Sequence, residues 1–113
     1  QTIELKCGRA ADILKSLPAD IEPFDFIFID ADKQSYPEYL ELSLNLSHSG
    51  TLIFLDNVIR AGDIINPENH KPSIEGIRDM FKAMQNHPKI LSCTALQTVG
   101  SKGHDGFALA IVK

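Results

Sequence analysis

Residues that could do chemistry follow two apolar runs of the sequence, 24–29 and 51–55. They are Asp30, Asp32 and Lys33 after the first run, and Asp56 and Asn57 after the second. If the two runs are neighbouring strands of one sheet, their ends lie about 5 Å apart and three carboxylates crowd one edge. A positive group must then balance this edge, and the sequence offers either Lys33 alone or a bound divalent cation.

A cation at this edge would be held by Asp30, Asp56 and the amide oxygen of Asn57. Such an all-oxygen set suits Mg²⁺, Mn²⁺ or Ca²⁺ and does not suit structural zinc. Three protein ligands leave about three of six octahedral positions open, as a catalytic metal requires. The alternative is structural, because Asp and Asn are common turn and cap residues. Asp30 or Asp32 could cap a helix that begins near Tyr36.

Other polar groups of the chain offer less. The four histidines show no spacing typical of metal ligands, and we expect them to lie on the surface. The glycine-rich run 100–106 superficially resembles a phosphate-binding loop, but no helix follows it, so we expect a hairpin loop. Gly-x-Ser-x-Gly, His-Glu-x-x-His and Cys-x-x-Cys motifs are absent from the sequence, which leaves hydrolase and zinc-site interpretations without support.

Strand and helix patterns alternate along the chain and predict an α/β fold. Apolar spacing predicts helices over 10–17, over 36–46 and around Ile74, Ile77, Phe81 and Met84, and strands over 2–6, 24–29, 51–55, 90–98 and 107–112. The last two strands have no helix between them, so one strand should run antiparallel in an otherwise parallel sheet. Ligands collect at the carboxyl ends of strands in such a sheet, which is where the acidic residues stand.

Composition bounds the class of protein. The chain has 113 residues, 43% hydrophobic and 23% charged, which is enough to bury the core of one domain. Its formal net charge is −4 and its basic residues are scattered singly, so the sequence shows no basic patch that would bind nucleic acid or a membrane surface. No segment reaches the ~18 apolar residues of a membrane-spanning helix. Two widely separated cysteines, Cys7 and Cys93, favour the reducing cytoplasm.

One stretch of sequence carries a family resemblance. The run Phe24-Asp-Phe-Ile-Phe-Ile-Asp-Ala-Asp-Lys33, followed by Tyr36 and by Leu-Ile-Phe-Leu-Asp-Asn57, resembles the cation-dependent O-methyltransferases of the caffeoyl-CoA and catechol type. The likeness extends from the Ile-Glu-Leu-Lys-Cys-Gly-Arg-Ala start to the closing Asp-Gly-Phe-Ala-Leu-Ala. It implies a Rossmann-like methyltransferase fold, S-adenosylmethionine (SAM) as cofactor, and methyl transfer to a hydroxyl of a small vicinal-dihydroxy aromatic.

The resemblance also implies roles for individual positions. Lys33 would be the general base, Asp30, Asp56 and Asn57 the metal ligands, and Ala10, Asp30, Asp32 and Tyr39 the cofactor contacts. A phenol with a pKa near 10 is mostly protonated at neutral pH, so the reaction needs help in removing the proton. A cation beside two adjacent hydroxyl oxygens would stabilise the phenolate and favour the neutral amine of Lys33, which could then take the proton.

The sequence departs from the family pattern after Asn57. The plant enzymes usually carry a Trp-Asn pair there, whereas this chain has Val58-Ile-Arg60-Ala61 and no tryptophan. Arg60 could meet an anionic substrate or lie in a solvated loop. Two alternative functions stay open: a relative that methylates hydroxylated uridine in tRNA, and a non-catalytic α/β module whose acidic residues are only caps.

The other departure concerns the start of the chain, where Gln1 directly precedes a strand-like run without a Met or a signal peptide. The glycine-rich turn and the acidic ribose-binding residue of the family are expected before Gln1, so residues 1–113 should be the C-terminal part of a single methyltransferase domain, inactive alone. The family's strand order places 107–112 between 51–55 and 90–98, and it leaves 24–29 without its usual neighbour. We expect residues 3–6 to fill that place, or two chains to pair there as a homodimer.

Overall fold

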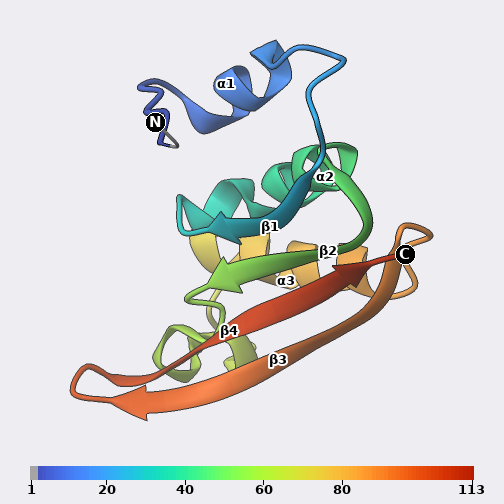
Figure 1. Ribbon diagram of the computed structural model, residues 1–113. Coiled ribbons are helices and arrows are strands. Elements are labelled where there is room, and N and C mark those ends of the chain that lie inside the picture. Colours follow the sequence, from blue (N-terminus) through green and yellow to red (C-terminus); the bar gives the residue numbers. More distant parts are fainter. Residues whose placement is uncertain (1–2) are drawn as a thin grey trace.

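The computed structural model describes residues 3–113, which form a four-stranded sheet with helices packed on it (Figure 1). With η marking 3-10 turns, the elements are α1 (Ala10–Ser16), β1 (Phe24–Ile29), η1 (Lys33–Ser35), α2 (Tyr36–Asn45), β2 (Ser47–Asp56), η2 (Arg60–Ile65), α3 (Pro72–Met84), β3 (Ile90–Gly100) and β4 (Gly103–Val112). No helix in this part of the chain is long and apolar enough to cross a membrane.

The sheet has the strand order β1-β2-β4-β3. Strands β1 and β2 run parallel, and β4 is antiparallel to both of its neighbours. This confirms the prediction of a mostly parallel α/β sheet with one antiparallel strand, and it confirms that 107–112 lies between the other two strands. Strands β3 and β4 form a hairpin whose turn is residues 101–102, so the predicted hairpin is confirmed with a shorter loop than 100–106.

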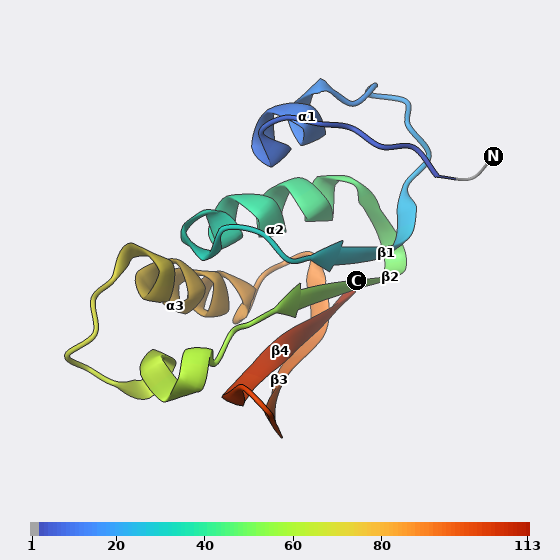
Figure 2. The ribbon, with the colours of Figure 1, turned by 90° about the vertical axis from the view of Figure 1, so that its left-hand side faces the viewer.

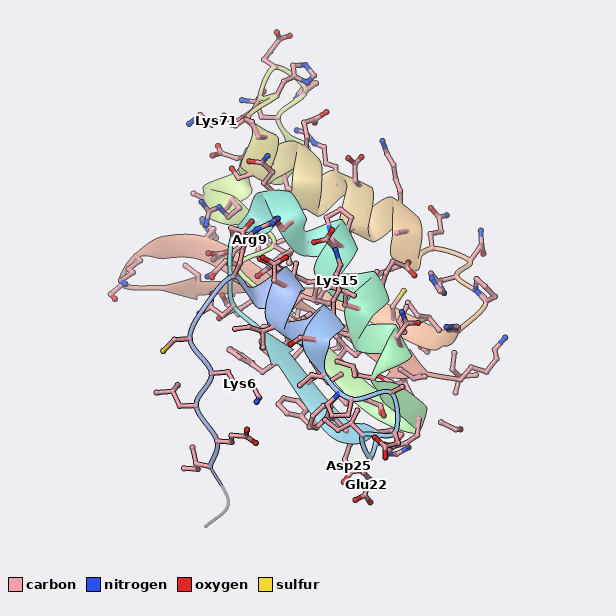
Figure 3. All side chains as sticks on the ribbon, turned by 90° about the horizontal axis from the view of Figure 1, so that it is seen from above. Lys6, Arg9, Lys15, Glu22, Asp25 and Lys71 are labelled. Atoms are coloured by element: carbon pink, nitrogen blue, oxygen red, sulfur yellow. The ribbon has the colours of Figure 1, made fainter. Side chains whose placement is uncertain are left out.

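The core lies between the sheet and helices α2 and α3, which both cover the same face (Figure 2). Because successive side chains of a strand point to opposite faces, β2 turns Ile53 and Leu55 toward these helices, and both side chains are fully buried. Helix α3 contributes Ile77 and Met80 to the same core, and both side chains are also fully buried. Helix α1 lies beyond β1 and is tied to α2 by Lys15, whose Nζ is 3.6 Å from Glu38 Oε2 (Figure 3).

The opposite face of the sheet has no helix over it among the described residues (Figure 2). Three aromatic rings from β1, β2 and β4 stack across it. The ring centroids of Phe28 and Phe54 are 5.1 Å apart, and those of Phe54 and Phe107 are 4.7 Å apart. On β1, Phe26 is 53% exposed and Phe28 is 55% exposed, so this face presents a continuous apolar surface.

The predicted strand over residues 2–6 is wrong for the residues that the structure describes, and Thr2 lies outside them. Residues 3–7 form no strand, and Ile3 and Leu5 are 81% and 86% exposed. Within residues 3–113, β1 pairs only with β2, so its other edge is bare. Two apolar side chains bury too little surface to offset the entropy lost by ordering a short edge strand. Pairing of two chains at this edge stays a prediction.

Candidate active site

The register of β1 and β2 brings the two acidic strand ends together. Ile29 stands opposite Leu55, so Asp30 and Asp56 follow at the same edge of the sheet. The hydroxyl of Tyr36, at the start of α2, closes the gap between the strands: its Oη lies 2.6 Å from the Asp56 carbonyl oxygen and 3.3 Å from that of Ile29. The predicted crowding of carboxylates at one edge therefore has a structural basis.

The pKa of the Tyr36 hydroxyl depends on the charges at this edge. The side chain of this tyrosine is fully buried, and burial raises the pKa of its hydroxyl far above the ordinary value. The charges of Asp30 and Asp56 raise that pKa further, which means that both carboxylates lie close to the same hydroxyl. Tyr36 is thus a proton donor at any physiological pH and holds the two strand ends in place. Sequence reasoning gave this buried hydroxyl no role, because a tyrosine at a helix start is ordinary core.

Lys33 is buried at the acidic edge, with 8% of its side chain exposed. Its Nζ donates to the Ala31 carbonyl oxygen at 2.8 Å and to Asp30 Oδ1 at 3.2 Å, and it lies 4.8 Å from the centroid of the Tyr36 ring. Helix α3 packs closely on the backbone here, since a Cβ on Gly76 would overlap the Lys33 carbonyl oxygen. The side chain of the predicted general base therefore lies beside Asp30, on a backbone segment packed against α3.

Asn57 lies where β2 ends and the chain turns, with a left-handed φ of 59°. This confirms the turn that the Asp-Asn pair predicts. The backbone N–H of Asn57 donates to Asp56 Oδ1 at 2.8 Å. Its side-chain nitrogen donates to Asp105 Oδ2 at 3.1 Å, so its side-chain oxygen is left free to accept or to bind a cation.

Asp105 is a site residue that sequence reasoning missed. Its Oδ1 accepts the backbone N–H groups of Ile59, Arg60 and Gly106, at 3.3, 3.1 and 2.9 Å. Burial alone would raise the pKa of Asp105, but these bonds and the one from Asn57 together lower it. The register of β2 with β4 is what reveals its position. Asp56 pairs with Phe107, and Asp105 lies two residues before Phe107 on β4.

The donor set at this edge fits a hard divalent cation. Asp30 and Asp56 offer carboxylates from neighbouring strand ends, and Asn57 offers a neutral oxygen whose direction is set by Asp105. Residues 3–113 hold no group of three or more His, Cys, Asp or Glu side chains arranged for a metal ion. A cation bound here would therefore have two carboxylates and the Asn57 amide as its protein ligands.

The cofactor residues implied by the resemblance lie around one groove. Ala10, Asp30 and Tyr39 line a hollow of about 490 Å³ between α1 and β1, whose floor is otherwise mostly apolar. Asp32 lies outside this lining, but Tyr39 Oη donates to its Oδ1 at 2.5 Å. Hydrogen bonds from Ser35 and from Tyr39 lower the pKa of the Asp32 carboxyl, so it is anionic beside the groove. Its charge is available to a polar ligand.

Fold and site together define a Rossmann-like α/β protein with an acidic strand edge. Comparison with known proteins gives the family: the chain belongs to the O-methyltransferases, whose pattern it matches over residues 1–110. The resemblance drawn from the Asp-Ala-Asp-Lys and Asp-Asn motifs is therefore confirmed at the level of the family.

Individual relatives agree. The chain is 46% identical over 112 residues to a catechol O-methyltransferase of Niastella koreensis, with 98% of this chain and 50% of the relative covered. Against a catechol O-methyltransferase of Mycobacterium tuberculosis it is 41% identical over 111 residues, covering 98% and 49%. A crystal structure of the O-methyltransferase from Bacillus cereus in complex with SAH matches with a TM-score of 0.91 at 50% identity, covering 97% and 50%. The chain spans about half the length of the curated relatives it matches.

Proposed function

We propose that the protein carrying this chain transfers a methyl group from SAM to a hydroxyl of a small vicinal-dihydroxy aromatic. The observation that carries the proposal is the acidic edge formed by Asp30, Asp56 and Asn57, with Lys33 buried beside it, in a chain of the O-methyltransferase family. The relatives named as catechol O-methyltransferases support the acceptor class.

In this proposal, Ala10, Asp30, Asp32 and Tyr39 hold the cofactor along the groove between α1 and β1. The Bacillus cereus enzyme, crystallised in complex with SAH, supports this cofactor. SAM supplies an electrophilic methyl group on a sulfonium sulfur. The anionic Asp32, fixed by Tyr39, offers an acceptor for the hydroxyl groups of such a ligand. The mostly apolar lining of the groove would pack against the apolar parts of such a ligand.

Asp30, Asp56 and Asn57 hold a divalent cation in this proposal. Mg²⁺ or a similar ion supplies a Lewis acid, which lowers the pKa of acceptor hydroxyls beside it. Asp105 accepts a hydrogen bond from the Asn57 side-chain nitrogen, so the amide oxygen of Asn57 would be the atom available to such an ion. Tyr36 keeps the ends of β1 and β2 at a constant separation and so preserves the spacing of the two carboxylates.

Lys33 moves the proton. Its Nζ would accept the proton of the acceptor hydroxyl, and SAM, when bound, would supply the methyl group to the acceptor oxygen. The overall products would be the methyl ether, SAH and a protonated Lys33, so charge and atoms balance. The hydrogen bonds of Nζ to Ala31 and Asp30 and its position over the Tyr36 ring hold it beside the acidic edge, and such orientation contributes to the rate.

The test uses the protein at its full natural length, with SAM, Mg²⁺ and catechol. We expect methylated catechol, a fall in kcat of about 100-fold or more in Lys33→Gln, and loss of the calorimetric Mg²⁺ signal in Asp56→Ala. Asp79→Ala is the matched control, since Asp79 is 62% exposed on α3 and pairs only loosely with Lys82 at 3.9 Å. Absence of both Mg²⁺ binding and methylated product in the wild type would favour the non-catalytic module.

A further inference from the structure

A second hollow lies next to the acidic edge, at the turn end of the β3–β4 hairpin. We call it the hairpin hollow; it measures about 320 Å³ and is lined by Arg60, Ala61, Asp63 and residues 102–105. Asp105 belongs both to this wall and to the acidic edge, because it holds the amide of Asn57. A ligand bound at the acidic edge could therefore extend into the hairpin hollow.

Arg60, which lines this hollow, has a strained backbone conformation. Arg60 and Ala61 adopt left-handed φ angles of 57° and 56°. This conformation is unfavourable for a residue with a side chain, and glycine would adopt it without strain. The conformation is held by the Arg60 N–H on Asp105 and by the Gly62 N–H on the Ile59 carbonyl oxygen, at 3.1 Å each. Strain that persists at a non-glycine residue beside a candidate active site is typical of a functional position.

Cationic side chains of the hollow have no carboxylate partner. Among residues 3–113, neither Arg60 nor Lys102 forms an ion pair. The Asp105 carboxylate is already occupied by three backbone donors and by Asn57, which leaves Asp63 as the opposing charge in the wall. Arg60 lines this hollow together with Asp105, the residue that also holds Asn57 at the acidic edge.

We propose that the hairpin hollow binds a carboxylate substituent of the methyl acceptor, with Arg60 as its principal contact and Lys102 as a second. This inference rests on the proposed function and deepens it: the acceptor is a dihydroxy aromatic acid in preference to a neutral catechol. A planar guanidinium pairs with both oxygens of a carboxylate, so recognition is directional as well as electrostatic. The two hydroxyl oxygens then face the acidic edge while the acid group faces Arg60.

The test compares 3,4-dihydroxybenzoate with catechol on the protein at its full natural length with Mg²⁺, using calorimetry for Kd and product formation for kcat and KM. We expect the wild type to bind the acid about tenfold or more tightly than catechol, the size of a charge-assisted pair. In Arg60→Gln this ratio should fall close to one. Arg60→Gly is the second variant, because glycine adopts the left-handed backbone without strain and so removes the side chain without unfolding the loop.

Lys82→Gln is the control for the loss of one positive charge, since Lys82 is 79% exposed on α3, and it should keep the wild-type ratio. Equal binding of the two ligands by the wild type, or an unchanged ratio in Arg60→Gly, would overturn the inference while leaving methyl transfer intact. If neither ligand is methylated, the proposed function fails, and the ratio of the two Kd values still decides whether the hollow selects the acid.

Discussion

The side-chain nitrogen of Asn57 donates to Asp105 Oδ2 at 3.1 Å, across 48 positions of the chain. This bond joins the end of β2 to the start of β4 and determines that the amide oxygen of Asn57 is the atom left free. Because Asp105 also accepts three backbone N–H groups from both sides of the loop, one carboxylate organises the turn and the candidate ligand together.

Removing the Asp105 carboxylate should weaken metal binding without touching a ligand. In Asp105→Ala the Asn57 amide loses its fixed direction, and losing a group that orients a metal ligand costs about 10- to 100-fold in metal affinity. Calorimetric titration with Mg²⁺ measures the change. Asp79→Ala on α3 is the control and should keep the wild-type affinity. Equal Mg²⁺ affinity in Asp105→Ala and in the wild type would show that Asn57 is oriented by other means.

The same carboxylate predicts a pH dependence of stability. Its folded pKa is lowered, so it stabilises the fold above the unfolded pKa of about 4 and loses that contribution as the pH falls through the folded pKa. The difference in the free energy of unfolding between the wild type and Asp105→Ala should therefore be larger at pH 6 than at pH 3, by urea titration. Ser73→Ala, a non-titrating change at a partly exposed residue in the first turn of α3, should show no such trend. A gap that widens toward acid would refute this assignment.

Gly76 on α3 should not tolerate alanine, although alanine is the better helix former. Helix propensity favours Gly76→Ala by about 1 kcal/mol. The added Cβ would lie 2.7 Å from Gln34 Cα and overlap the Lys33 carbonyl oxygen, both of them backbone atoms that cannot swing aside. Overpacking costs about 1–3 kcal/mol, so we expect net destabilisation in urea unfolding. Lys82→Ala, exposed on the same helix, should stay within about 0.5 kcal/mol of the wild type; a more stable Gly76→Ala would contradict the close packing.

Element types could be predicted from the sequence because local pattern decides them. The run 24–29 is apolar on both faces, and its bounds match those of β1. The antiparallel position of β4 followed from the lack of a helix before it. Residues 3–6 carry a strand pattern too, but a strand also needs a partner, and pairing depends on residues far away in the chain.

The candidate site could be predicted only in part, for a related reason. Asp30, Asp56 and Asn57 could be found because each follows an apolar run directly. Asp105 could not, because its role depends on the register of β2 with β4 and on a bond across 48 positions. The sequence pattern placed Asp105 in the hairpin loop predicted over 100–106. In the structure it lies in β4, which begins at Gly103, before the apolar run 107–112.

The bare edge of β1 should make the isolated chain self-associate. Phe26 and Phe28 are half exposed on β1, whose one edge is unpaired among the described residues, and such an edge recruits another strand. The stacked rings of Phe54 and Phe107 extend the apolar surface beside them. Sedimentation velocity at low and high concentration should show dimers or larger species. The double variant Phe26→Lys/Phe28→Lys should stay monomeric, because charged edge strands resist pairing. Ile65→Lys, at an 84% exposed residue of η2, adds one lysine elsewhere and should associate like the wild type. A wild type that stays monomeric at high concentration would contradict this prediction.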